Sequence, residues 1–365
     1  MKTYRAAVIG RTGRGDYGHH LDEVWTGLPN VELVAVADDD KMGLAKTAAK
    51  LKAPQAFADY REMLDKAKPD LVSIGVRWLD QHRDMVVACA ERGIHMYLEK
   101  PFCRTLAEAD AMVAACEQTH TKLAIAHQTR YSPKLPVVKE ILASGKLGRV
   151  LEIRGRGKED ARGGAEDLWV LGSQIVDLMR TLAGDPNWCV GSVTKESRPI
   201  TTADIAEGNE GIGPLAGDGV RAMYGLPDGV TGYFNSYKGA GGGPRFGLQV
   251  FCTGGILEMQ TNYMPQVWVL RDPAWSPGRN KKKWEPVSTA GIGESEPLID
   301  EGPNKANQLA VLDLIAAVEE NRETRSNIYD ARWTIEMIAG VFASNKSGAV
   351  VELPLKERHN PLASA

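Results

Sequence analysis

The chain begins with a short apolar run that passes directly into a glycine-rich turn, and this junction constrains its fold more than any other feature. Residues Tyr4–Ile9 are followed by glycines at positions 10, 13, 15 and 18. Glycines after a strand let the backbone approach a phosphate closely and present free N–H groups to it. Because glycine-rich turns are common, this spacing indicates a nucleotide site only where strands and helices surround it.

Short apolar runs alternate with helical patterns up to about residue 150. Helical spacing is visible in Met85–Ala90 and Met112–Cys116. Further strands are expected at Val31–Ala37, Leu71–Val76, Ile94–Leu98 and Leu123–His127. Apolar strands separated by helices are typical of a parallel sheet buried on both faces. The N-terminal part is therefore predicted to be an α/β domain with a doubly wound parallel sheet of the Rossmann type.

The pattern changes after about residue 150. Strand–turn–strand signals follow one another from Cys189 to Leu270, and these signals indicate an antiparallel sheet. Additional elements are expected at Val150–Arg156 (strand), Leu171–Leu182, Asn307–Glu319 and Ala331–Ser344 (helices). We predict a dinucleotide-binding domain over residues 1–130. Residues 131–365 are predicted to form an α+β domain with a large, mostly antiparallel open sheet, whose C-terminal helices can pack back on the first domain.

Composition excludes several classes of protein. With 44 Lys+Arg against 47 Asp+Glu, the net charge of −3 gives no field that would hold a nucleic acid. No run of about 18 apolar residues occurs and the first apolar run is too short for a signal peptide, so we expect no membrane partner and a cytoplasmic location. The five cysteines form no Cys-x-x-Cys pair, which predicts reduced thiols and no metal site.

The turn and the second strand together predict a dinucleotide cofactor. Gly13-x-Gly15-x-x-Gly18 matches the dinucleotide fingerprint, and the helical pattern after it would turn a positive helix end toward the pyrophosphate. Asp38 can accept the ribose hydroxyls of adenosine and repel the 2′-phosphate of NADP, which favours NAD. Alternatively, residues 38–40 only cap the next helix. Since two arginines of the turn suit a 2′-phosphate equally well, NADP stays possible. Cofactor contacts are expected from Gly10, Arg11, Thr12, Gly13, Arg14, Gly15, Asp38 and Asp39.

A Glu-Lys-Pro sequence, Glu99-Lys100-Pro101, stands at the end of the predicted strand Ile94–Leu98, where open α/β sheets bind ligands. Here the chain resembles the Gfo/Idh/MocA family of NAD(P)-dependent sugar oxidoreductases. The other matching pieces span nearly the whole chain and are His82, Glu108, His127–Pro133, Gly145–Val150 and the run ending at Val351–Pro354. The resemblance implies a Rossmann domain followed by an open-faced sheet. That sheet covers the nicotinamide and mediates assembly, here into a homo-oligomer (a dimer or tetramer).

The resemblance also implies a site. In the family the lysine of the motif lies beside the nicotinamide and the reacting carbinol, and that residue is Lys100 here. Its ammonium would stabilise a developing alkoxide and exchange the hydroxyl proton, with Glu99 orienting it. Tyr131 is expected to assist the proton transfer. The cofactor side is expected to include Gly75, His82, Glu99, Lys100 and Gln128.

The first helix of the second domain departs from the family pattern. Many members carry an Asp and a His four residues apart there, whereas this chain has Val170 and Gln174. Glutamine cannot take a proton near neutral pH. In one hypothesis Lys100, with Tyr131 or a water, transfers the proton in an NAD(P)-dependent dehydrogenase or reductase acting on a sugar, polyol or glycoside hydroxyl. In a second, bound NAD oxidises a sugar transiently and a glycoside is cleaved, or a group eliminated, without net redox change. In a third, the chain is an inactive nucleotide or sugar sensor.

Several residues of the second domain suit a polyol substrate. Aromatic faces and arginine forks recognise sugars, so contacts with the substrate are expected from Lys100, Arg130, Arg162, Trp169, Gln174 and Asp177. The glycine-rich segment Ala203–Gly219 is predicted to be a functional loop whose acidic residues bind sugar hydroxyls or only keep the surface soluble. His19 and His20, just beyond the glycine turn, either approach the cofactor or substrate or lie on the surface.

Overall fold

The computed structural model describes residues 2–241 and 243–363, and its contacts divide the chain into two units. The first unit contains Met1–His127, Asn209–Ile212 and Pro303–Arg332. The second contains Gln128–Gly208, Gly213–Gly302 and Trp333–Ala365. The first unit thus ends close to residue 130, but it also takes up one C-terminal helix and a short piece of the loop Ala203–Gly219.

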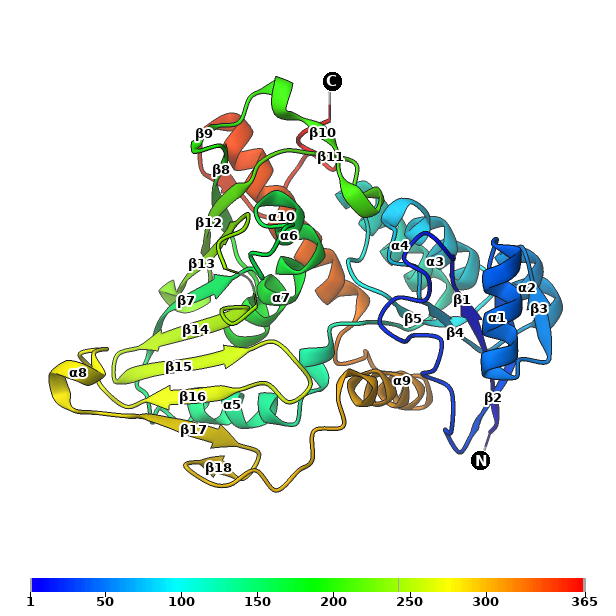
Figure 1. The fold of residues 1–365 in the computed structure, drawn as a ribbon, viewed down its shortest axis with the longest axis horizontal. Helices are drawn as coiled ribbons and strands as arrows, with labels where there is room; N and C mark the ends of the chain where they lie inside the picture. The colour runs from blue at the N-terminus through cyan, green and yellow to red at the C-terminus, as the bar shows by residue number, and fades with distance from the viewer. Residues whose placement is uncertain (1, 242, 364–365) are drawn as a thin grey trace. The chain divides into compact units, whose positions relative to one another are not determined.

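The first unit is built on a parallel sheet, as predicted (Figure 1). In the described residues this sheet has six strands in the order β3-β2-β1-β4-β5-β6. Their bounds are β1 Tyr4–Ile9, β2 Val31–Ala37, β3 Gln55–Phe57, β4 Leu71–Ile74, β5 His95–Leu98 and β6 Leu123–Ile125. The short edge strand β3 was not expected from the sequence, because its three residues lack an apolar run.

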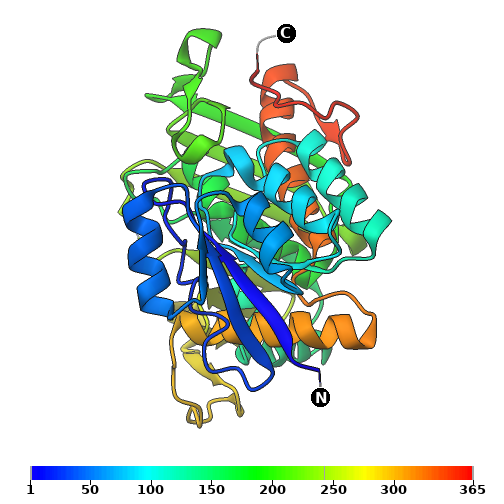
Figure 2. The same ribbon diagram turned by 90° about the vertical axis from the view of Figure 1, so that its right-hand side faces the viewer.

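Helices cover this sheet on both faces. They are α1 Lys41–Leu51, α2 Tyr60–Ala67, α3 His82–Ala90, α4 Leu106–Thr119 and α9 Pro303–Glu320. Helix α3 contacts β4 and β5 on the face that α4 also covers, while α9 contacts β5 and β6 on the opposite face (Figure 2). Side chains of Asp40, Asp59 and Thr105 cap α1, α2 and α4. Capping of α1 by Asp40 confirms the capping role expected for residues 38–40.

The first crossover, between β1 and β2, contains no helix in the described residues, and the expectation of a helix there is wrong. Residues 11–30 form consecutive turns instead. The physical reason is backbone conformation, because an α-helix needs negative φ throughout. Positive φ recurs in this segment at Gly13, Gly15, Gly18, His20 and Gly27. Buried Leu21, Val24 and Trp25 nevertheless attach the segment to the sheet.

The second unit is built on a large, mostly antiparallel sheet, which was also predicted. In the described residues it has eleven strands in the order β18-β17-β16-β15-β14-β7-β13-β12-β8-β19, with β9 paired to β8. Only β7 and β13 pair in parallel among these strands. The bounds are β7 Val150–Arg156, β8 Trp188–Lys195, β9 Arg198–Pro199, β12 Gly219–Gly225, β13 Thr231–Tyr237, β14 Gly247–Cys252, β15 Gly255–Gln260, β16 Val267–Leu270, β17 Trp284–Ser288, β18 Gly291–Ile292 and β19 Val351–Glu352.

One face of this sheet is covered and the other is open. Helices α6 and α7 contact β12, β13 and neighbouring strands. Burial alternates along β13, where Gly232, Phe234 and Ser236 are buried and the residues between them are half-buried. The remaining elements are the strand pair β10 Ala206–Glu207 and β11 Pro214–Leu215, with α5 Lys134–Ala143, α6 Ala165–Val170, α7 Gly172–Ala183, α8 Pro277–Asn280 and α10 Ile328–Ser347.

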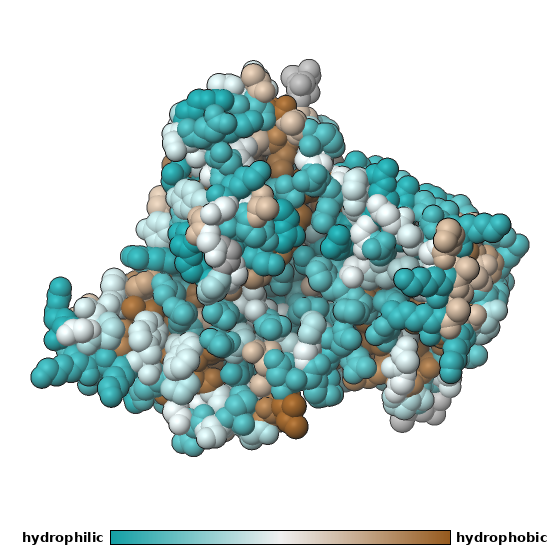
Figure 3. All heavy atoms as spheres, viewed as in Figure 1, coloured by the Kyte–Doolittle hydropathy of each residue, from teal (hydrophilic) through white to brown (hydrophobic). Residues whose placement is uncertain are grey.

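Hydrophilic residues dominate the surface in view, and apolar residues appear on it in small groups (Figure 3). None of the helices in the described part of the chain is long and apolar enough to cross a membrane.

The hydrogen bond from Trp25 Nε1 to Ser73 Oγ, 3.0 Å long and buried, joins the irregular crossover to β4. Ser73→Ala leaves the indole N–H without this acceptor, so we expect a loss of about 1–3 kcal/mol in the free energy of unfolding. Urea unfolding measures it. The double variant Trp25→Phe/Ser73→Ala should show a coupling between the two positions. Strictly additive effects of the two substitutions would contradict the role given to this bond.

Candidate active site

Asp38 lies at the end of β2 with its carboxylate bonded inside the first unit. Oδ1 accepts hydrogen bonds from the backbone N–H groups of Thr12 (3.0 Å) and Asp40 (2.9 Å). Oδ2 accepts from Thr12 Oγ1 (2.7 Å) and from the Tyr17 hydroxyl (2.9 Å). Asp38 is only 2% exposed. It therefore fastens the glycine turn to β2, and its contact with adenosine ribose stays a prediction.

The glycine turn has an open side at the end of β1. A Cβ atom on Gly13 would meet nothing within 4 Å, and both Gly13 and Gly15 have positive φ. On Gly15 a Cβ atom would lie 2.6 Å from Cβ of Arg77. The Nε atom of Arg77 is buried and has no hydrogen-bond partner among the described residues. Gly15 is thus packed under Arg77, whereas the backbone at Gly13 is open and suits a phosphate of a dinucleotide.

Two arginines of the turn are held in different ways. The Arg11 guanidinium lies between two carboxylates, 2.8 Å from Asp39 and 3.3 Å from Asp80. Arg14 stacks on the Trp78 ring, with Cζ 4.3 Å from the ring centroid. Asp39 is the exposed carboxylate at the end of β2, with 54% of its side chain accessible. Of the two carboxylates expected to contact a cofactor at this strand end, Asp39 is thus exposed beside Arg11 and Asp38 is enclosed.

Part of the loop Ala203–Gly219 belongs to the first unit. Residues Asn209–Ile212 are assigned to the first unit, where the short helix Asn209–Gly211 contacts Leu79–Gln81. Glu210 lies 3.5 Å from Arg77. Among the acidic residues of this loop, Glu210 is therefore placed near the glycine turn, beside Arg77.

The Glu-Lys-Pro motif follows β5 directly and is buried. Glu99 is 0% exposed and Lys100 is 8% exposed. Glu99 Oε1 accepts from the Lys100 backbone N–H at 3.0 Å. Glu99 Oε2 accepts from the His19 backbone N–H at 2.9 Å and lies 3.0 Å from His19 Nδ1. The carboxylate thus joins β5 to the first crossover through His19, in addition to its contact with Lys100.

The surroundings of Glu99 determine its charge. Burial by itself would raise the pKa of this carboxyl group. The charge and hydrogen bonds of His19, together with the charge of Lys100, outweigh burial and lower the pKa to about 2. Glu99 is therefore an anion at neutral pH, bonded to His19 and to the backbone N–H of Lys100.

His82 and Gly75 lie at the carboxyl ends of the same sheet but are enclosed. Both ring nitrogens of His82 lie near carbonyl oxygens, Nδ1 3.0 Å from Phe102 O and Nε2 2.6 Å from Val76 O. Since His82 is fully buried, it links the end of β4 to the segment after Glu-Lys-Pro. A Cβ atom on Gly75 would lie 2.9 Å from Tyr17 O, so glycine is needed there for the crossover to pack.

In the second unit, Arg130 and Asp177 form an ion pair. Arg130 Nη1 lies 3.2 Å from Asp177 Oδ1 and also bonds to Thr181 Oγ1. Both partners are nearly buried. The pair joins the 3₁₀ turn Gln128–Tyr131 to α7, and Tyr131 is itself buried. These residues hold the start of the second unit together, and their contacts with a substrate stay predictions.

The helix that departs from the family pattern is broken into α6 and α7 at Leu171. Val170 and Trp169 are buried, whereas Gln174 is half-buried near the start of α7. Arg162 is held by Asp160, with Nη2 2.6 Å from Oδ2. Three residues of α6 and α7 were expected to bind substrate, Trp169, Gln174 and Asp177. Of these, Gln174 has a partly accessible polar side chain.

Sequence reasoning missed the partners that shape this site. Tyr17 binds Asp38, Asp80 binds Arg11, and Trp78 stacks on Arg14. No local pattern identifies such contacts, because each joins segments far apart in the chain. Within residues 2–241 and 243–363 no group of three or more His, Cys, Asp or Glu side chains is arranged to hold a metal ion.

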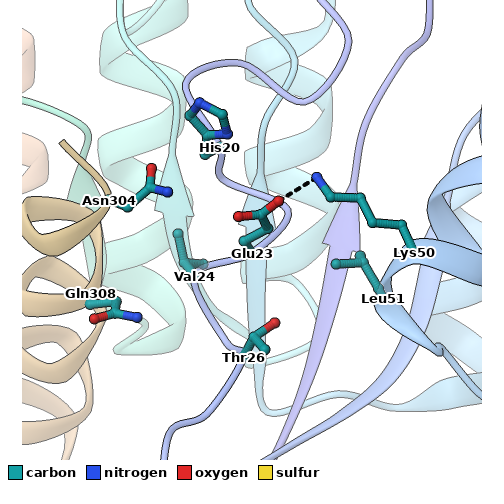
Figure 4. A pocket seen from close by; sticks show the side chains of 8 residues that line it. All are labelled: His20, Glu23, Val24, Thr26, Lys50, Leu51, Asn304 and Gln308. Atoms are coloured by element: carbon teal, nitrogen blue, oxygen red, sulfur yellow. Dashed lines mark ion pairs between the residues drawn. The ribbon is translucent and has the colours of Figure 1, made fainter. Parts of the chain in front are cut away.

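A separate pocket of about 330 Å³ lies beside the crossover (Figure 4). It is lined by His20 to Thr26 on one side and by the end of α1 and the start of α9 on the others. Lys50 lies 2.6 Å from Asp22 and 2.5 Å from Glu23. His20 lines this pocket, whereas its neighbour His19 binds Glu99.

The depressed pKa of Glu99 makes stability depend on pH in a defined direction. A carboxyl group with a lowered folded-state pKa contributes stability above its unfolded pKa, near 4.5, and loses that contribution as pH falls toward about 2. Between pH 7 and pH 3 this one group accounts for a loss of about 2 kcal/mol. Urea unfolding of wild type and Glu99→Gln should show a difference that shrinks by this amount. A difference independent of pH would contradict the ionised pair.

Comparison with known proteins finds a match to one family model in the N-terminal part of the chain. The profile of the Gfo/Idh/MocA oxidoreductase family, NAD-binding Rossmann fold, matches residues 4–127. The chain is 27% identical over 219 residues to a D-apiose dehydrogenase of Paraburkholderia graminis, covering 56% of each chain. It is 23% identical over 334 residues to D-xylose 1-dehydrogenase (NADP(+)) 2 of Haloferax volcanii, covering 88% of this chain and 92% of that protein. The first curated relatives are matched over only 50% to 60% of their own length.

A solved structure of levoglucosan dehydrogenase, in complex with NADH and L-sorbose, matches with a TM-score of 0.77. The match covers 97% of this chain and 100% of that chain at 19% identity, so it establishes the fold. Residues 4–127 are thus similar to the NAD-binding Rossmann fold of the Gfo/Idh/MocA oxidoreductases, and the whole chain shares the fold of the solved structure.

Proposed function

We propose that this protein is an NAD(P)-dependent dehydrogenase that moves a hydride between a nicotinamide cofactor and a hydroxyl group of a sugar or polyol. The observation that carries the proposal is the burial of Glu99 and Lys100 at the carboxyl edge of the parallel sheet, where the Glu99 carboxylate binds the backbone N–H of Lys100. Burying a lysine to 8% exposure costs free energy, and a chemical role for its charge accounts for that cost. Stabilising an alkoxide beside a dinucleotide is such a role.

In the first unit, the residues of the glycine turn would bind the cofactor and Lys100 would act on the substrate oxygen. The glycine turn, Arg77 and Arg14 surround the open backbone that would take the pyrophosphate. A bound dinucleotide supplies the nicotinamide carbon that accepts or gives the hydride. Lys100 attracts the substrate oxygen electrostatically, and its burial strengthens that attraction because water screens it less.

Similarity to relatives supports the substrate class. The relatives described above are named as dehydrogenases of apiose and xylose, and a structural neighbour holds L-sorbose. Gln174 on α7 supplies an amide that can donate to and accept from a hydroxyl group. We infer that the second unit binds the polyol through Gln174 and its neighbours.

We also propose that the protein is cytoplasmic and forms a homo-oligomer through the open face of its large sheet. All five cysteines are free and buried, as expected in a reducing compartment. The half-buried residues of β13 on the open face provide a surface that a second copy would cover. Sedimentation of the purified protein tests the assembly.

Replacing Lys100 tests the activity. Lys100→Met should bind NADH as the wild type does, yet lose at least ~10² in turnover, because the charge that stabilises the alkoxide is gone. Fluorescence titration measures NADH binding, and absorbance of the reduced nicotinamide measures turnover with a sugar panel. Lys146→Met, an exposed lysine, serves as the control and should stay fully active. Full activity of Lys100→Met would exclude the proposed role.

The same sugar panel separates the alternatives. Net NADH production with a sugar supports the dehydrogenase. A changed sugar without net NADH supports redox-neutral cleavage or elimination, and no reaction despite binding supports a sensor. Either of the last two outcomes would replace the proposed function.

Asp39 is expected to set the preference between NAD and NADP. Asp39→Asn removes the exposed negative charge at the end of β2 and releases Arg11 toward a 2′-phosphate. Loss of one exposed charge changes binding by about 1 kcal/mol, or roughly fivefold, so the ratio of NADPH to NADH affinity should rise by that factor. Glu32→Gln, exposed near the start of β2, is the control. An unchanged affinity ratio in Asp39→Asn would place the 2′-position elsewhere.

A further inference from the structure

The positions that carry an Asp and a His in many family members hold no proton acceptor here. Val170 is buried and aliphatic, and Gln174 is a neutral amide. Tyr131 is buried. Oxidation of a hydroxyl nevertheless releases one proton for each hydride, so a group must receive it. The first unit offers a candidate for that group beside Lys100.

We propose that His19, oriented by the buried carboxylate of Glu99, is the general base that takes the substrate's hydroxyl proton and returns it in the reverse reaction. His19 Nδ1 lies 3.0 Å from Glu99 Oε2, and the backbone N–H of His19 donates to the same oxygen. A carboxylate at Nδ1 holds the proton there, so Nε2 is the nitrogen that can accept another. The side chain is 45% exposed, which gives solutes access to it.

Position supports this role as well. Glu99 bonds both to His19 and to the backbone N–H of Lys100, so one carboxylate fixes the imidazole and the start of the lysine residue at the end of β5. The charged groups that β5 brings to His19 are Glu99 and Lys100, and α9 brings the neutral amide of Asn307, whose Nδ2 donates to His19 O. The contact with Asn307 fixes the backbone of His19, and the contact with Glu99 orients its ring.

The other histidines are placed differently. His82 and His127 are buried, and His20 lines the separate pocket of Figure 4. Burial lowers the pKa of His95 to about 4, and its Nδ1 accepts from the Lys122 backbone N–H. Of the histidines compared here, His19 is the one whose ring bonds to the buried Glu99 carboxylate.

The step balances with the groups named. The substrate C–H bond breaks and its electron pair leaves with the hydrogen to the cofactor, while the O–H bond breaks and its proton moves to His19 Nε2. A carbonyl group forms. The resulting imidazolium is stabilised by the Glu99 carboxylate, and Lys100 keeps its proton and stabilises the negative oxygen. Reversal of each movement gives the reduction.

This inference rests on the proposed function, and His19→Asn tests it separately. Asparagine can still donate from its amide to Glu99 but cannot take a proton. We expect unchanged thermal stability and NADH binding and at least a ~10²-fold loss of turnover. The pH profile of kcat/KM should differ between the wild type and the variant, because the variant lacks the group that takes the proton. His20→Asn, whose left-handed backbone conformation suits asparagine, is the matched control and should keep turnover within about twofold.

A second measurement does not depend on turnover. Diethyl pyrocarbonate acylates accessible neutral imidazoles, and peptide mass spectrometry locates the product. Bound NADH should protect His19 and leave His20 reactive. The inference is overturned if His19→Asn keeps wild-type turnover and pH profile, if it loses stability and NADH binding together with turnover, or if NADH leaves His19 unprotected. A wild type that produces no NADH with any sugar instead overturns the proposed function, whatever His19→Asn does.

Discussion

The buried carboxylate of Glu99 connects the segments on which the candidate site depends. It receives hydrogen bonds from His19 in the first crossover and from Lys100 after β5. A Cβ atom on Gly18 would lie 2.3 Å from its Oε2, so only glycine allows the crossover to approach this closely. A carboxylate with these partners stays ionised despite its burial. This carboxylate then fixes His19 and the backbone of Lys100 at the carboxyl end of β5.

The irregular first crossover changes how the phosphate turn works. Without a helix after β1, no macrodipole reinforces the binding of a pyrophosphate. Two arginines lie at this turn, Arg14 stacked on Trp78 and Arg77 packed on Gly15 with Nη2 3.5 Å from Glu210. The turn itself is held by Asp38 through Thr12 and Tyr17. The shape of the turn thus comes from side-chain contacts rather than from a helix N-terminus.

Local pattern predicted most of the architecture. Strands β1, β2 and β7 have the expected bounds, because continuous or alternating apolar runs ended by glycine or charged residues are unambiguous. The helix expected after the glycine turn was wrong, since a helical apolar spacing is also produced by a chain of turns that buries Leu21, Val24 and Trp25. Strand β3 was missed because edge strands need few apolar residues.

For the site, the sequence identified the positions but not their partners. Glu99-Lys100-Pro101 and the glycine turn are contiguous motifs, and their places at strand ends follow from the strand pattern alone. That Glu99 binds His19, and that Asp38 is enclosed by Thr12 and Tyr17, depends on contacts across 80, 26 and 21 positions of the chain.

The sequence by itself therefore determined the fold class, the two sheets and the residue types at the strand ends, because hydrophobic periodicity and turn chemistry are local properties. Only the tertiary structure decided which carboxylate is buried and which is exposed, and which histidine lies against Glu99 rather than in the neighbouring pocket. Burial and hydrogen-bond partners result from packing between distant segments, and they set the charge and the accessible atoms on which the chemistry depends.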